Sequence, residues 1–230
     1  MKAPFRPHIC YNGLMRKHLS AFAAALLTFT SGGEVYWNVL GMTDSSLEVK
    51  KIADNLAAGP STSVLLTNDN GQVFLSYDGS KNVNVSGYKE DIIEVEEKSA
   101  GTISIKVADS GFSIKQRDVT VNTSFPIKVN SRENKLSVET ATGEKFLAVL
   151  PYEAVTQIIR TNIVSSVVSG SLIEKEEGEV VYAVDGEKQI TLFNIFSFAI
   201  PIKVEISATT GTVMNVDQPL WYSVVDFLLV

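Results

Sequence analysis

The stretch Ile103-Ser104-Ile105-Lys106-Val107 shows most clearly how this chain folds. Its apolar and polar side chains alternate, and successive side chains of an extended strand point to opposite faces of a sheet. The pattern therefore predicts a β-strand with one buried face. The same alternation recurs upstream at 82–85 and downstream at 119–122, so we expect β-strands to dominate the fold.

Strand patterns of this kind recur about every eight to twelve residues between Ser63 and Thr123, and Gly, Asn and Asp separate them. Among these turns, Asn68-Asp69-Asn70-Gly71 predicts a hairpin. This spacing is typical of an antiparallel sandwich, partial barrel or meander. One helix is also expected here. Asp44 offers a cap, the apolar residues from Leu47 to Leu56 follow a helical spacing, and Gly59-Pro60 ends the pattern.

The second half of the chain combines one more expected helix with further strands. Pro151 suits the first position of a helix, and apolar residues from there to about Val164 recur at intervals of three and four. We therefore expect a β-dominated α+β fold, with an antiparallel strand-rich region and about two helices. The expected divisions are a leader at 1–33, a β-rich region with one helix at 34–124, and an α+β region at 125–230.

The residues after the second helix carry a resemblance to a known family. A strand pattern leads to a turn at Glu176-Glu177-Gly178, and Val180-Val181-Tyr182-Ala183-Val184 follows. The stretch from Ile202 to Val213 is similar to the closing hairpin of PepSY-type domains, usually written V-x-V-D-A-x-T-G-x-V. Here Ser207 replaces the usual acid, and an apolar insert at 190–199 separates the strands.

This resemblance covers about 60 residues of the chain. It implies a small helix-plus-hairpins module found in exported and cell-envelope proteins, in some cases as a propeptide-like peptidase inhibitor. It supplies no catalytic residue.

Residues 1–33 have the order of a secretory signal peptide. A basic cluster at 16–18 precedes eleven mostly apolar residues at 19–29, and small residues follow. That run is shorter than the roughly 20 residues that span a bilayer. Met15 lies directly before the basic cluster, which leaves Met1 or Met15 as the start of translation. An uncleaved N-terminal anchor and an ordinary N-terminal helix are the alternatives, so a membrane contact is expected only through this segment.

Charge and composition exclude several classes of function. Residues 1–33 hold four basic side chains and no acid, so the other 16 basic and 26 acidic side chains leave the rest of the chain at −10. A body this acidic repels phosphate groups, which argues against binding nucleic acid. The only cysteine, Cys10, and both histidines, His8 and His18, also lie in the first 33 residues. Once the leader is removed, no Ser–His–Asp relay, Cys–His pair or histidine metal site remains.

Carboxylates and turns give no specific catalytic or cofactor pattern. The acidic clusters at 90–97 and 174–179 fall in expected turns and strand ends, where water keeps carboxylates ordinary. A glycosidase instead needs one acid held in an apolar pocket. Asn68-Asp69-Asn70-Gly71 resembles the start of a calcium loop but lacks the distal glutamate. No catalytic residue, metal ligand or cofactor is therefore expected.

Two unusually apolar segments are the candidate binding residues. One runs from Ile190 to Pro201 and the other from Pro219 to Val230. Trp and Tyr favour positions that are half apolar and half wet, as at interfaces. The alternative is that both segments pack as ordinary core strands or helices. The residues expected to dock a partner are Trp221, Tyr222, Phe227, Phe196 and Phe198.

These observations together favour a non-enzymatic, exported protein, secreted or held in the cell envelope, that acts as an interaction module. Its expected partner is another envelope protein or a peptidase. The alternatives are a propeptide-like peptidase inhibitor or regulator, and a hydrolase based on carboxylates.

Overall fold

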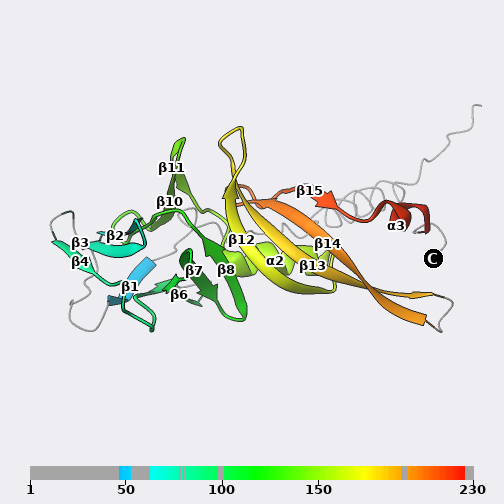
Figure 1. Ribbon diagram of the computed structural model, residues 1–230, viewed down its shortest axis with the longest axis horizontal. Helices are drawn as coiled ribbons and strands as arrows, with labels where there is room; N and C mark the ends of the chain where they lie inside the picture. Colours follow the sequence, from blue (N-terminus) through cyan, green and yellow to red (C-terminus); the bar gives the residue numbers. More distant parts are fainter. Residues whose placement is uncertain are drawn as a thin grey trace, which may run out of the picture. The chain divides into compact units, whose positions relative to one another are not determined.

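The computed structural model of the chain describes residues 47–52, 63–77, 79, 81–97, 101–192 and 196–225. Within these ranges the protein consists of two β-sheets and two short helices (Figure 1). The expected dominance of β-strands is therefore confirmed. Neither described helix is long and apolar enough to cross a bilayer.

The larger sheet has nine strands, and all of its neighbours pair antiparallel except one. The exception is the parallel pair β8–β12, which is joined through Ser171 and Asn122. In spatial order the strands are β1 (Leu47–Ile52), β5 (Ile93–Glu97), β6 (Gly101–Ala108), β7 (Gly111–Gln116), β8 (Val119–Thr123), β12 (Ser166–Glu174), β13 (Val180–Leu192), β14 (Phe196–Ser207) and β15 (Val213–Asp217).

The smaller sheet has six strands, all antiparallel. The turn at Asn68–Gly71 connects two of them as expected, and the Gly71 N–H donates to Asn68 Oδ1 at 3.0 Å. In spatial order the strands are β11 (Gly143–Phe146), β10 (Lys135–Thr140), β9 (Ile127–Asn130), β2 (Ser63–Asp69), β3 (Gln72–Tyr77) and β4 (Lys81–Asn84).

Alternation along the strands separates buried from solvent-facing side chains. On β6, Ile103 and Ile105 are fully buried, whereas Ser104 and Lys106 are partly exposed. Since side chains of a strand alternate between its two faces, the polar residues of β6 share the outer face. The strand expected from residues 103–107 is thus confirmed.

Helix α2 (Pro151–Arg160) begins at the proline, as expected. It buries Pro151, Ala154, Val155 and Ile158, which is the spacing of one helix face. The helix ends earlier than Val164. At its C-terminus the Thr161 N–H and Oγ1–H both donate to the Gln157 carbonyl, and the following residue takes a positive φ.

The helix expected between Leu47 and Leu56 is wrong, because residues 47–52 form strand β1. The pairing of β1 with β5 contains a β-bulge between Val49 and Lys51. An extra residue in a strand shifts the side-chain alternation by one. Val49 and Ile52 are therefore both buried although they are three residues apart, which is also a helical spacing. Residues 53–62 lie outside the described part of the chain.

The expected helix-plus-hairpins module in the last third is also wrong. Strands β12 to β15 continue the nine-stranded sheet, and the parallel pair β8–β12 ties them to the earlier strands. Strands from both sides of residue 124 also pair within the smaller sheet, where β9 lies beside β2. The PepSY-like hairpin signals were local, and local turns do not specify which other strands a hairpin joins.

Candidate docking surface

Strands β13 and β14 extend past both of their neighbours (Figure 1). Strand β12 pairs with β13 only as far as Glu187, and β15 pairs with β14 only over Lys203–Ile206. Beyond these points Lys188–Leu192 and Phe196–Ile200 pair only with each other among the described strands. We call this two-stranded segment the ribbon.

One face of the ribbon is apolar. Residues directly opposite each other in an antiparallel pair share a face. Ile190 is opposite Phe198, and Lys188 is opposite Ile200, so these four lie on one face. Ile190 and Ile200 are buried there.

The other face of the ribbon is small and polar. Gln189 is opposite Ala199, and Thr191 is opposite Ser197. The hydroxyl oxygens of Thr191 and Ser197 lie 3.0 Å apart, within hydrogen-bond distance. The ribbon is therefore amphipathic, and its apolar face is the one that gains stability when it is shielded from water.

Helix α3 (Leu220–Val225) contacts the apolar face. The ring centroid of Trp221 lies 6.0 Å from that of Phe198, and Tyr222 meets Trp221 edge-on at 6.3 Å. The Lys188 ammonium lies 5.8 Å from the centre of the Tyr222 ring, within cation–π range. Tyr222 is only 3% exposed, so it is part of the core beneath the helix.

This cover is incomplete and leaves large apolar side chains in water. Phe196 is 65% exposed, Phe198 36%, Leu220 89% and Trp221 49%. We call these four residues the apolar patch. Scattered exposed apolar residues are normal, but a group of them with aromatic members marks an interaction surface.

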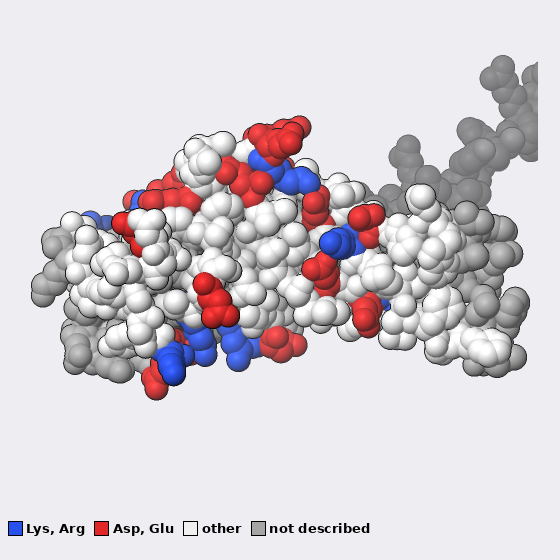
Figure 2. Space-filling model, viewed as in Figure 1, with Lys and Arg blue, Asp and Glu red and all other residues white. Residues whose placement is uncertain are grey.

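Charged side chains are absent from the sequence around this patch. Neither the fourteen residues at 189–202 nor the eight at 218–225 contain Asp, Glu, Lys or Arg. Figure 2 shows the consequence on one face: the described atoms towards the right-hand end, where Figure 1 places the ribbon and α3, are mostly white. Interface cores elsewhere are depleted in charge and enriched in aromatic residues in the same way.

The structure brings together most of the residues expected to dock a partner. The ring of Phe198 on β14 contacts that of Trp221 on α3, and Trp221 in turn contacts Tyr222. Phe196 lies on the same ribbon as Phe198. Tyr222 is buried, so it supports the patch from below. Phe227 lies outside the described residues. Sequence reasoning did not anticipate Lys188. Its position two residues before Ile190 could have placed it on the apolar face, because residues two apart in a strand share a face.

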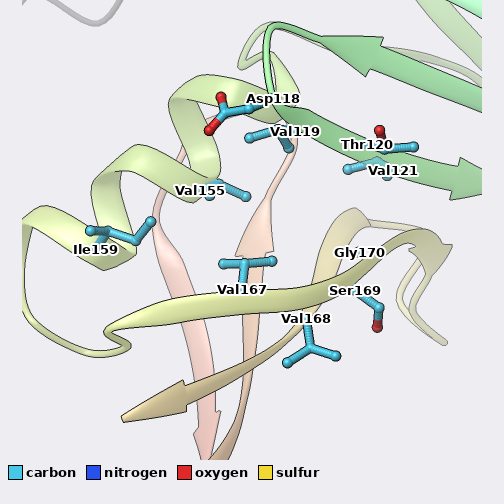
Figure 3. Close-up of a pocket in the computed structure, with 10 residues that line it drawn as sticks. All are labelled: Asp118, Val119, Thr120, Val121, Val155, Ile159, Val167, Val168, Ser169 and Gly170. Atoms are coloured by element: carbon cyan, nitrogen blue, oxygen red, sulfur yellow. The ribbon is translucent and has the colours of Figure 1, made fainter. Parts of the chain in front are cut away.

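A cleft of about 250 Å³ opens between β8, α2 and β12 (Figure 3). It lies where the two strands of the parallel pair separate, and a β-bulge in β12 at Val168 displaces the strand there. Sequence reasoning missed this cleft, because it depends on which strands are neighbours. Its lining residues are Asp118, Val119, Thr120, Val121, Val155, Ile159, Val167, Val168, Ser169 and Gly170.

A partly buried carboxyl group lies at the start of α2. The pKa of Glu153 is raised to about 7, chiefly by burial and to a smaller extent by the nearby Glu97 carboxylate. The Leu150 N–H, which donates to Glu153 Oε2 at 3.3 Å, and the positive charge of Arg117 act in the opposite direction. Sequence reasoning missed this residue, since its pKa is set by burial and by neighbours that the fold brings close.

Two of the acids lie outside this cleft. Glu97 is only 2% exposed, unlike the solvated face expected for its cluster, but neither it nor Glu153 lines the cleft of Figure 3. Asp118 is the one acid that does. Paired carboxylates catalyse glycoside cleavage only when both face the substrate.

The second acidic cluster has a structural contact instead. Glu174 on β12 accepts hydrogen bonds from the hydroxyls of Thr140 and Thr142 and from the Ala141 N–H. These bonds hold the pKa of Glu174 below its usual range. They tie the β10–β11 turn of the smaller sheet to the larger sheet. Among the described residues no group of three His, Cys, Asp or Glu is placed to hold a metal ion.

Comparison with known proteins gives no family model, no curated protein and no solved structure that matches this chain.

Proposed function

We propose that this protein is a non-enzymatic interaction module, secreted or held in the cell envelope, that binds a partner through the apolar patch. The observation that supports this most directly is the half-exposed pair of Phe198 and Trp221, whose rings lie 6.0 Å apart on a face where Lys188 is the charged residue of the ribbon. Removing such surface from water contributes about 25 cal/mol for each Å² buried.

The partner that suits this patch is a protein with an apolar surface of its own. Three of the four patch residues are aromatic and none carries a charge, which is the composition of an interface core. The acidic charge of the body disfavours anionic lipid and nucleic acid as partners. A membrane contact is proposed only through residues 1–33, if they are retained.

The alternative of a propeptide-like peptidase inhibitor rested mainly on the PepSY resemblance, and strands β12 to β15 do not form the helix-plus-hairpins module that this resemblance implies. The hydrolase alternative needs two acids facing one opening, and Glu97 and Glu153 do not line the cleft. No specific observation favours either over an interaction module.

Photo-crosslinking in the native cell tests the proposed function. With p-benzoylphenylalanine in place of Trp221, irradiation should give a discrete adduct that mass spectrometry identifies. The same reagent in place of Gln189, which is exposed on the polar ribbon face, is the matched control. Equal yields from both positions, or no adduct from either, would overturn the proposal.

Export is tested separately by sequencing the N-terminus of the protein recovered from the envelope or the medium. We expect a chain that begins near residue 34, or an intact N-terminus that fractionates with the membrane. An intact chain in the cytosol would contradict the proposed location.

A further inference from the structure

Part of the outer edge of β14, beside the apolar patch, has no partner among the described strands. On one side β14 pairs with β13 along its whole length, whereas β15 covers the other side only at Lys203–Ile206. Among the described strands, none pairs with the outer edge of Phe196–Ile202. An edge of this length without charge is a template for another strand.

Charge indicates what kind of strand fits this edge. The chain after residue 33 carries a net −10, so two copies repel each other through most surfaces. The stretch 189–202 is uncharged, and two copies can approach there without bringing acids together. Native edge strands are often protected by lysines, inward-pointing charges or proline, and this one has none of these between Phe196 and Ile200.

The pattern along the edge is self-complementary. In an antiparallel pair of two β14 strands related by a two-fold axis at Phe198, Phe196 of one copy is opposite Ile200 of the other. Ser197 is then opposite Ala199, so apolar residues share one face and small residues the other. Pro201 has no N–H to donate, which ends the pairing after Ile200.

We propose that two copies of this chain associate antiparallel along the outer edges of β14, with a two-fold axis at Phe198. This inference rests on the proposed function and names the partner at the same surface as a second copy. Such pairing joins the two ribbons into four strands, and it places the two apolar patches next to each other. A symmetric two-fold contact of this kind is the commonest one in homo-oligomers.

Sedimentation velocity of the purified chain tests the association. We expect the weight-average mass to rise from one copy towards two as the concentration increases. Ala199→Lys places a charge on the outer strand, close to its symmetry mate, and should weaken association at least tenfold. Gln189→Lys adds the same charge to the directly opposite residue on β13, away from the contact, and should associate like the original chain.

Ala199 and Gln189 are both exposed, so neither lysine substitution should affect folding. Matching thermal transitions of the two variants verify this. Equal association of the two variants would overturn the proposal.

Engineered cysteines test the register. In a Cys10→Ser background, a mixture of Ser197→Cys and Ala199→Cys chains should form a mixed disulfide dimer under mild oxidation. Each variant alone should form much less, because residues 197 and 199 are opposite each other and not opposite themselves. Equal yields from the mixture and the single variants would overturn the two-fold axis at Phe198.

The outcomes separate this inference from the proposed function. A chain that stays monomeric at all concentrations, but crosslinks through position 221 to a different protein, overturns the second copy and leaves the interaction module supported. A crosslinked adduct of two copies supports both. A monomeric chain without any adduct overturns both.

Discussion

Strands β6 and β14 have the same alternating pattern but different surroundings. Strand β6 pairs on both sides, with β5 and β7, and its apolar residues Ile103 and Ile105 are fully buried. Strand β14 is equally regular, yet its first half lacks one neighbour among the described strands and exposes Phe196 and Phe198. Alternation therefore predicts a strand, while the neighbouring elements decide whether its apolar face is buried or exposed.

Truncating a core residue of β6 should give the largest effect. Ile105→Ala removes a side chain with no exposed surface, and such changes cost about 2–5 kcal/mol of unfolding free energy. Urea unfolding measures it. If the variant does not fold, Ile105→Val should still cost about 0.5–1.5 kcal/mol. A cost near zero would mean that β6 is not part of the core.

Removing a buried hydrogen bond of strand β13 should cause the next largest loss of stability. The Tyr182 hydroxyl is fully buried and donates to the Val149 carbonyl at 2.7 Å. Tyr182→Phe leaves this carbonyl without the bond, which costs about 1–3 kcal/mol. The change in urea midpoint measures it, and an unchanged midpoint would show that the hydrogen bond contributes nothing.

Raising the pH should lower the free energy of unfolding through Glu153, at the start of α2. The folded protein raises the pKa of Glu153 to about 7 from its ordinary 4.5, so the folded state binds this proton more tightly than the unfolded state. Stability therefore falls as the pH rises from 4.5 to about 7, and levels off above that range. Because the carboxyl is only partly buried, we expect a loss of about 1–2 kcal/mol.

The control for this titration is Glu153→Gln, which retains an oxygen for the Leu150 N–H. The difference in unfolding free energy between the original chain and this variant should change over that pH range. A constant difference from pH 4.5 to 7.5 would contradict the raised pKa.

The smallest effect is expected on the ribbon. Phe196 is 65% exposed, so Phe196→Ser should change stability by no more than about 0.5 kcal/mol. Thermal unfolding measures it. A loss above about 1.5 kcal/mol would mean that this aromatic ring belongs to the core, and the comparison between β6 and β14 would then fail.

Local signals were sufficient where a structure depends on neighbouring residues in the chain. Pro151 placed the start of α2, and Asn68–Gly71 placed a hairpin. They failed at Val49 and Ile52, where a β-bulge gives a strand the spacing of a helix. A bulge depends on the partner strand, which the local sequence does not name.

The candidate site divides in the same way. Composition identified Phe196, Phe198 and Trp221 as candidate docking residues, because aromatic side chains without nearby charge are uncommon on a surface. It could not distinguish Tyr222 from them, since burial under α3 depends on how that helix meets the ribbon. The raised pKa of Glu153 could not be predicted for a related reason, because it comes from the elements packed around that residue.

The amino-acid order thus determined the strand character, the start of α2, the acidic body and the uncharged apolar segments, because each follows from side chains close together in the chain. Tertiary structure alone decided that β12 lies parallel to β8, that β13 and β14 extend past their neighbours, and that the outer edge of Phe196–Ile202 has no partner among the described strands. These features depend on contacts between residues far apart in sequence. They leave Phe196 and Phe198 on the apolar face of β14 exposed.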